Sequence, residues 1–137
     1  MTTNPLRAAL AALILAAPAS AATALPPLEN NARIMGELVA GEVGYQIQKH
    51  CPTIGARKVR ALFKLNELAN YARSLGYTDE NFNALSKDGD ARAKRDALVE
   101  AYLEENGVVK GDPESYCRLG REEIEKNSLT GSLLSAK

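Results

Sequence analysis

Apolar side chains recur along this chain at steps of three, four and seven residues, which is the period of an α-helix. The repeat is clear in residues 28–49, 56–75 and 91–106, where no strand-like alternation competes with it. We therefore predict an all-α fold in which four to five helices form a small orthogonal or bundle-like array. The side chains expected to face its core are Ile34, Met35, Leu38, Val39, Val43, Tyr45, Ile47, Val59, Leu62, Phe63, Leu65, Leu68, Ala69, Ala72, Leu75, Leu98, Val99, Tyr102 and Leu103.

Residues that start or stop helices mark the ends of these ranges. Pro52 disfavours the helical conformation in the residue before it, so the first helix should end there. Gly76 is well placed to end the second helix in the left-handed conformation. Thr78 has the character of an N-cap for a short helix, and Asp112 with Pro113 predicts the start of a helix that ends near residue 126. The last nine residues are expected to add one turn at most.

A row of small residues follows one face of the first predicted helix at four-residue intervals: Ala32, Gly36, Ala40 and Gly44. Each Gly inside a helix costs about 1 kcal/mol relative to Ala, so a gain in packing should offset that cost. We expect the row to lie against another helix of the same domain. The alternative is a groove that receives a partner helix or a ligand.

The N-terminal segment has the pattern of a secretory signal peptide. Arg7 precedes an apolar run, and Pro18 and the small residues after it precede a cleavage point before Ala22. Because Pro18 interrupts the apolar run early, a membrane span is the less favoured alternative. We predict a signal peptide at residues 1–21 and a periplasmic or secreted protein with no transmembrane span after cleavage.

The remaining chain divides into two parts. Residues 22–28 contain a Pro-Pro pair and are predicted to form a flexible leader. Residues 29–137 contain all the helical repeats and are predicted to form a single all-helical domain. The sequence leaves the oligomeric state open.

The expected compartment determines the redox state that we predict for the two cysteines, Cys51 and Cys117. Disulfides persist in oxidising environments, so we predict one disulfide between them. An intermolecular bridge or two free thiols are the alternatives. The chain has no CxxC motif and only one His, so zinc, c-type haem and thioredoxin-like sites lack ligands or spacing.

The composition excludes several classes of function. Seventeen basic and seventeen acidic residues cancel, so nothing in the bulk charge indicates nucleic-acid binding. His50 is the only imidazole, and we expect it to mark a helix end. No cofactor and no metal are expected. A small wall-active enzyme would have to use carboxylates, and the available ones are Glu67, Glu100, Glu104 and Glu105.

The charges are nevertheless unevenly distributed. Residues 43–66 contain five basic and no acidic residues, whereas residues 79–125 contain thirteen acidic and seven basic residues. Arg57, Arg60 and Lys64 are spaced to share one side of the second helix. This basic row is a candidate binding site for phospholipid headgroups, a wall polymer or an acidic protein surface. Alternatively, the charges complement each other within the fold or keep the protein in solution.

Four short motifs carry a resemblance: GYQI at 44–47, CPTI at 51–54, GYTD at 76–79 and GDPESYC at 111–117. In this order, and with the two cysteines, they resemble an uncharacterised family of short exported bacterial proteins, a domain of unknown function. The resemblance covers essentially the whole mature chain. It implies a secreted helical domain and supplies no catalytic residues.

We therefore expect an exported, non-enzymatic binding or interaction module of the bacterial envelope, whose partner is an envelope protein or an anionic envelope surface. A periplasmic stress chaperone or inhibitor is the first alternative, because the size, the helical content and the long-range cysteine pair are similar to those of small acid-stress chaperones. A carboxylate-dependent wall-active enzyme is the second.

Overall fold

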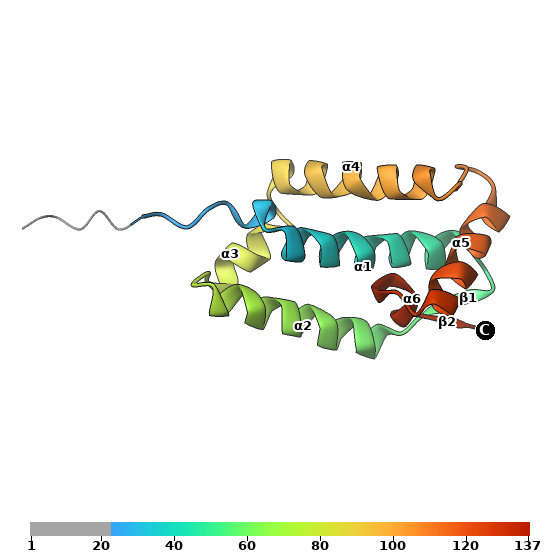
Figure 1. Ribbon diagram of the computed structural model, residues 1–137, viewed down its shortest axis with the longest axis horizontal. Helices are drawn as coiled ribbons and strands as arrows, with labels where there is room; N and C mark the ends of the chain where they lie inside the picture. The colour runs from blue at the N-terminus through green and yellow to red at the C-terminus, as the bar shows by residue number, and fades with distance from the viewer. Residues whose placement is uncertain (1–22) are drawn as a thin grey trace, which may run out of the picture.

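The computed structural model describes residues 23–137, and the predicted signal peptide lies outside this range. A short 3₁₀ helix, η1, is followed by six α-helices and two strands in this part of the chain (Figure 1). Their bounds are η1 Leu28–Asn30, α1 Ala32–His50, β1 Ile54–Ala56, α2 Lys58–Ser74, α3 Asp79–Ala84, α4 Gly89–Glu105, α5 Pro113–Lys126, α6 Leu129–Ser132 and β2 Leu134–Ala136. The predicted all-α fold class is confirmed. Within residues 23–137, no helix is both long and apolar enough to span a membrane.

Helix α1 is the central element of the fold. Figure 1 shows α1 between α4 and α2, with α5 and α6 gathered at the C-terminal end of α1. The strands β1 and β2 pair antiparallel at the same end, with Ile54 opposite Ala136. Each strand has three residues, which is too short for the alternation that a sequence pattern would reveal.

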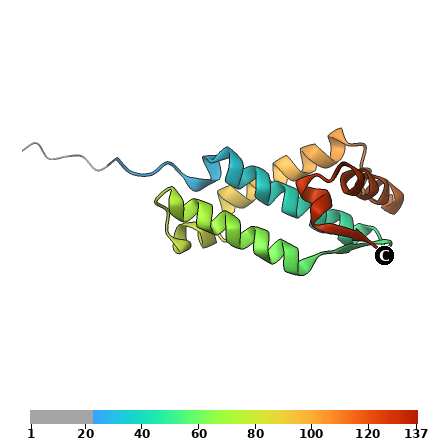
Figure 2. The same ribbon diagram turned by 60° about the horizontal axis from the view of Figure 1, so that its bottom comes forward.

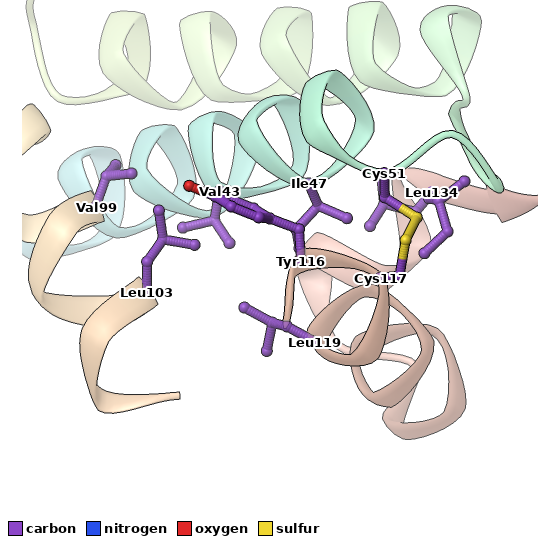
Figure 3. Packing of buried hydrophobic residues seen from close by; sticks show 10 residues of the cluster. Val43, Ile47, Cys51, Val99, Leu103, Tyr116, Cys117, Leu119 and Leu134 are labelled. Atoms are coloured by element: carbon purple, nitrogen blue, oxygen red, sulfur yellow. A yellow bond between two sulfur atoms is a disulfide. The ribbon is translucent and has the colours of Figure 1, made fainter. Parts of the chain in front are cut away.

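One core cluster surrounds the predicted disulfide, which the structure confirms (Figure 3). Cys51 and Cys117 are bonded, with an S–S distance of 2.08 Å, and both are buried. The disulfide joins the end of α1 to α5. Gly120 permits the close approach of α5 to α1 and β1, because a Cβ atom there would lie 2.7 Å from Ile47 Cγ2 on α1 and 2.3 Å from Ile54 Cδ1 on β1. The side chains of this cluster are Val43, Ile47, Ile54, Val99, Leu103, Tyr116, Leu119 and Leu134.

A second core cluster lies toward the opposite end of α1. It brings together η1, the first turns of α1, the second half of α2, and the residues around α3. Its buried side chains are Leu28, Ile34, Leu68, Ala72, Leu85 and Ala91. The chain before η1 also contacts this end, because Tyr77 Oη donates a hydrogen bond of 2.7 Å to Pro26 O. Two residues of the predicted leader thus contact the domain: Pro26 through this hydrogen bond, and Leu28 through its buried side chain.

The helix starts follow the expected chemistry. Thr78 and Asp112 cap α3 and α5 with their side chains, as predicted. Gly76 has φ +95°, the left-handed conformation expected after α2. Asn31, Asp88 and Ser128 cap α1, α4 and α6 in the same way.

The predicted core list is wrong for much of α2. Only Leu68 and Ala72 of this helix are buried, whereas Leu65 and Leu75 are exposed and Ala69 is half-buried. The reason is that α2 packs on the bundle mainly through its second half, so the outer side of its first half meets no other element. Tyr45 on α1 and Leu98 on α4 were also predicted to face the core, and both are exposed.

The two ends of the row of small residues on α1 have different surroundings. At one end, a Cβ on Gly44 would lie 3.8 Å from Thr130 Cγ2, and Thr130 Oγ1 donates a hydrogen bond of 3.0 Å to Ala40 O. This end of the row therefore contacts α6. At the other end, Ala32 is exposed, and a Cβ on Gly36 would meet nothing within 4 Å.

Gly36→Ala is accordingly expected to stabilise the protein by about 1 kcal/mol, because Ala is the better helix former and has free space here. Urea denaturation of the two oxidised proteins, followed by circular dichroism, measures the difference. Gly120→Ala serves as the contrast and should destabilise, since Ile54 and Ile47 must move. A Gly36→Ala variant that is less stable than the wild type would contradict this account of the open face.

Candidate functional site

Three large apolar side chains project from the first half of α2. Val59, Leu62 and Phe63 are 71%, 69% and 68% exposed. Spacings of three and four residues place them on one side of the helix, and we call them the apolar ridge. The sequence pattern identified all three but assigned them to the core.

The position of α2 explains why the apolar ridge is uncovered. The residue before the helix is tied to the C-terminal segment, because Arg57 N donates a hydrogen bond of 2.7 Å to Leu133 O. Leu68 and Ala72 hold the second half of the helix in the core. Figures 1 and 2 show α2 at the edge of the molecule, with one side facing away from the other elements.

The structure brings the predicted basic row together beside the apolar ridge. Arg57 is exposed, and Arg60 Nη1 donates a hydrogen bond of 3.4 Å to Ser132 O. Lys64 Nζ lies 2.7 Å from Glu67 Oε2 in an ion pair at the surface. These three cations, together with Lys58 and the acidic Glu67, line a groove of about 850 Å³, which we call the basic groove. Residues 127–129 and Ser132 form its other wall.

A second groove lies between α2 and α3. It measures about 580 Å³, and its apolar lining includes Leu62, Ala69 and Phe82. We call it the apolar groove. Val59 and Phe63 line both grooves, so part of the apolar ridge separates a cationic hollow from an apolar one.

The N-terminus of α2 adds to the positive potential at this end. Arg57 occupies the N-cap position without a side-chain hydrogen bond to the helix, and the first turn contains no acidic residue. The first backbone N–H groups of a helix have no partner within the helix and form the positive end of its dipole. The first half of α2 therefore combines four basic side chains, three exposed apolar side chains and the positive end of a helix.

The carboxylates considered for catalysis are all at the surface of α2 and α4. All four are exposed: Glu67, Glu100, Glu104 and Glu105. Glu67 pairs with Lys64 on α2, whereas Glu100 pairs with Lys110 beside α4. Glu100 and Glu104 are one turn apart on α4 and both are in solvent, whereas Glu67 lies on a different helix.

Glu123 on α5 is a buried carboxylate that the sequence analysis missed, with 2% of its surface exposed. It accepts a hydrogen bond of 2.5 Å from Tyr102 Oη and another from Ser128 Oγ. Its position three residues after the buried Gly120 could have indicated burial, but a carboxylate is rarely placed inside without visible partners. Burial, together with the bond to Glu123, raises the pKa of Tyr102 to about 12.

This raised pKa predicts a loss of stability in alkali. Between pH 10 and pH 12 the unfolded chain releases the Tyr102 proton while the folded protein retains it, so the free energy of unfolding falls as the pH rises. Tyr102→Phe removes that contribution and should show a shallower fall over the same range. Urea titrations of both proteins at several pH values test this. Equal slopes would contradict the role of the Tyr102–Glu123 bond.

His50 lies at the end of α1, as the sequence predicted, and its ring stacks on Tyr116 with the ring centroids 4.5 Å apart. Among residues 23–137, no group of three or more His, Cys, Asp or Glu side chains is arranged to hold a metal ion.

Comparison with known protein families gives a match over nearly the whole described chain. A family model described as a family of unknown function, DUF5333, matches residues 26–135. No curated protein and no solved structure matches the chain.

Proposed function

The chain belongs to the DUF5333 family, whose function is unknown, and on that premise we propose an exported, non-enzymatic binding module of the bacterial envelope that binds an anionic partner through helix α2. The observation that carries this proposal is the apolar ridge of Val59, Leu62 and Phe63 beside the basic row of Arg57, Arg60 and Lys64.

The apolar ridge supports binding because it leaves three large side chains in water on a single helix. Burial of each such side chain is worth about 1.5–3 kcal/mol, and the fold leaves this gain unused. Clustered apolar side chains with a polar border are typical of interaction sites, whereas scattered ones are ordinary. The neighbouring cations favour a partner of negative charge.

Export is supported by the disulfide and by the N-terminal sequence. A bond between Cys51 and Cys117 fits an environment more oxidising than the cytoplasm. The predicted signal peptide provides the route. Mass spectrometry of the protein recovered from the periplasm or medium should give a chain that begins at Ala22. A cytoplasmic chain that retains residues 1–21 would contradict export.

Photo-crosslinking in living cells tests the binding surface. A photoreactive amino acid at position 63 should crosslink to envelope material, and Arg57→Ala with Arg60→Ala and Lys64→Ala should reduce the yield. The matched control places the same amino acid at position 98 on α4, where Leu98 is also exposed. Equal yields at both positions, or no crosslink at position 63, would contradict the proposal.

A stress chaperone is the second candidate, and the apolar ridge favours it, because an exposed apolar surface can bind unfolded chains. A chaperone should suppress the aggregation of an unfolded client, and Phe63→Ser should weaken that activity. An acid-activated chaperone should also gain dye-accessible apolar surface at low pH. Absence of both effects would remove this candidate.

A further inference from the structure

We propose that the anionic partner is a phospholipid bilayer and that the first half of α2 lies in its headgroup region. This inference rests on the proposed function and names the partner of the same surface. The juxtaposition that carries it is an apolar ridge between a cationic groove and an apolar groove.

The pattern of residues around the apolar ridge fits an interfacial helix. Lys58, Arg60 and Lys64 line the basic groove together with Val59 and Phe63, and none of these three cations lines the apolar groove. Basic residues therefore border the ridge along the side of the basic groove. Helices that lie in a membrane interface place apolar side chains at the acyl boundary and Lys or Arg at the headgroups.

The two grooves fit the two parts of an anionic lipid. The basic groove gathers Arg57, Arg60 and Lys64, which can bind phosphate oxygens. The apolar groove, across the shared side chains of Val59 and Phe63, can receive acyl methylene groups. A single lipid lying across the ridge would then place its charge and its chain in matching surroundings.

The distribution of acids indicates which part of α2 meets the membrane. The first acidic residue after the ridge is Glu67, which pairs with Lys64. Asp79 lies further along, where it pairs with Arg73. The positive, apolar part of the surface is therefore limited to about two helical turns. Such a short contact predicts binding that is shallow, reversible and weakened by salt.

Vesicle co-sedimentation tests the inference with the oxidised mature protein. The two probes are vesicles of phosphatidylcholine alone and vesicles that also contain phosphatidylglycerol. We expect binding to the anionic vesicles only, with a loss at high salt. Each basic residue near an anionic surface contributes about fivefold, so replacing Arg57, Arg60 and Lys64 with Ala should weaken binding on the order of 100-fold.

Matched controls separate this surface from net charge and from general apolarity. Replacement of Lys87, Arg92 and Lys110 with Ala removes the same number of charges from exposed positions outside α2. It should change binding by less than about threefold, because these charges lie beyond close range of the membrane. Leu62→Ser with Phe63→Ser should abolish binding, whereas Leu98→Ser with Val109→Ser should not.

A fluorescence measurement keeps the test independent of multiple substitutions. The chain contains no Trp, so Phe63→Trp introduces a single reporter on the ridge. Its emission should shift to shorter wavelength with phosphatidylglycerol vesicles, and the emission of Leu98→Trp should not. The near-conservative change also keeps the fold and the ridge intact.

The outcomes are distinct. Selective binding that both ridge and row variants lose, together with the Phe63→Trp shift, supports the bilayer. No vesicle binding, or equal binding to both vesicle types, overturns it. If the protein fails to bind anionic vesicles selectively but position 63 crosslinks to a protein in cells, the partner is an acidic protein. The proposed function then stands, although the bilayer does not. If no crosslink forms there either, both proposals fail.

Discussion

Reduction of the Cys51–Cys117 disulfide is expected to lower the free energy of unfolding by about 4 kcal/mol. The two cysteines are separated by 66 positions, and closing a loop of this length strongly restricts the unfolded chain. Small domains are stable by only about 5–15 kcal/mol, so this loss is a large fraction of the total. Urea denaturation with and without a thiol reductant measures the effect.

The control for this experiment is the double variant Cys51→Ser with Cys117→Ser. Its unfolding should resemble that of the reduced protein and should not respond to the reductant. The structure adds a local reason for a large effect, because both sulfurs are buried in the cluster around Ile47 and Tyr116. A reduced protein within about 1 kcal/mol of the oxidised one would contradict this role.

Gly131→Ala is expected to destabilise the protein by about 3 kcal/mol. A Cβ atom at this position in α6 would lie 1.9 Å from Glu123 O on α5, and backbone atoms cannot turn aside as a side chain can. Helix α6 would have to move away from α5. That movement would also disturb the hydrogen bond from Thr130 to Ala40 and the packing of Leu134.

Gly41→Ala on α1 is the matched control for Gly131→Ala, because a Cβ there meets nothing within 4 Å. The control should keep or raise the denaturation midpoint, whereas Gly131→Ala should lower it in the same urea experiment. Near-identical midpoints for the two variants would mean that the contact between α5 and α6 is not close.

The sequence was sufficient to predict the helices and several of their ends. Local chemistry decides these features: Thr78 and Asp112 bond to nearby backbone N–H groups, and Gly76 adopts a backbone conformation that few other residues favour. The disulfide could be predicted because the chain contains only two cysteines and the expected compartment is oxidising. These predictions needed no knowledge of how the helices are arranged.

Which faces of each helix are covered by other elements could not be predicted in the same way. Periodicity indicates which side chains share a face, but it does not show whether another element covers that face. Val59 and Phe63 therefore look like core residues in the sequence, whereas Leu68 on the same helix is one. The burial of Glu123 depends on Tyr102, which is 21 residues away, and local patterns carry no record of that partner.

The covalent loop between Cys51 and Cys117 encloses α2, α3 and α4. A protease that cut once within this loop, for instance at the exposed turn of residues 86–88, would leave both fragments tethered to each other. The nicked molecule would gain only the mass of one water molecule, and its fragments would stay covalently joined until a reductant broke the disulfide. A peptidase that made a single cut there would thus leave the segment with the apolar ridge covalently attached to the rest of the protein.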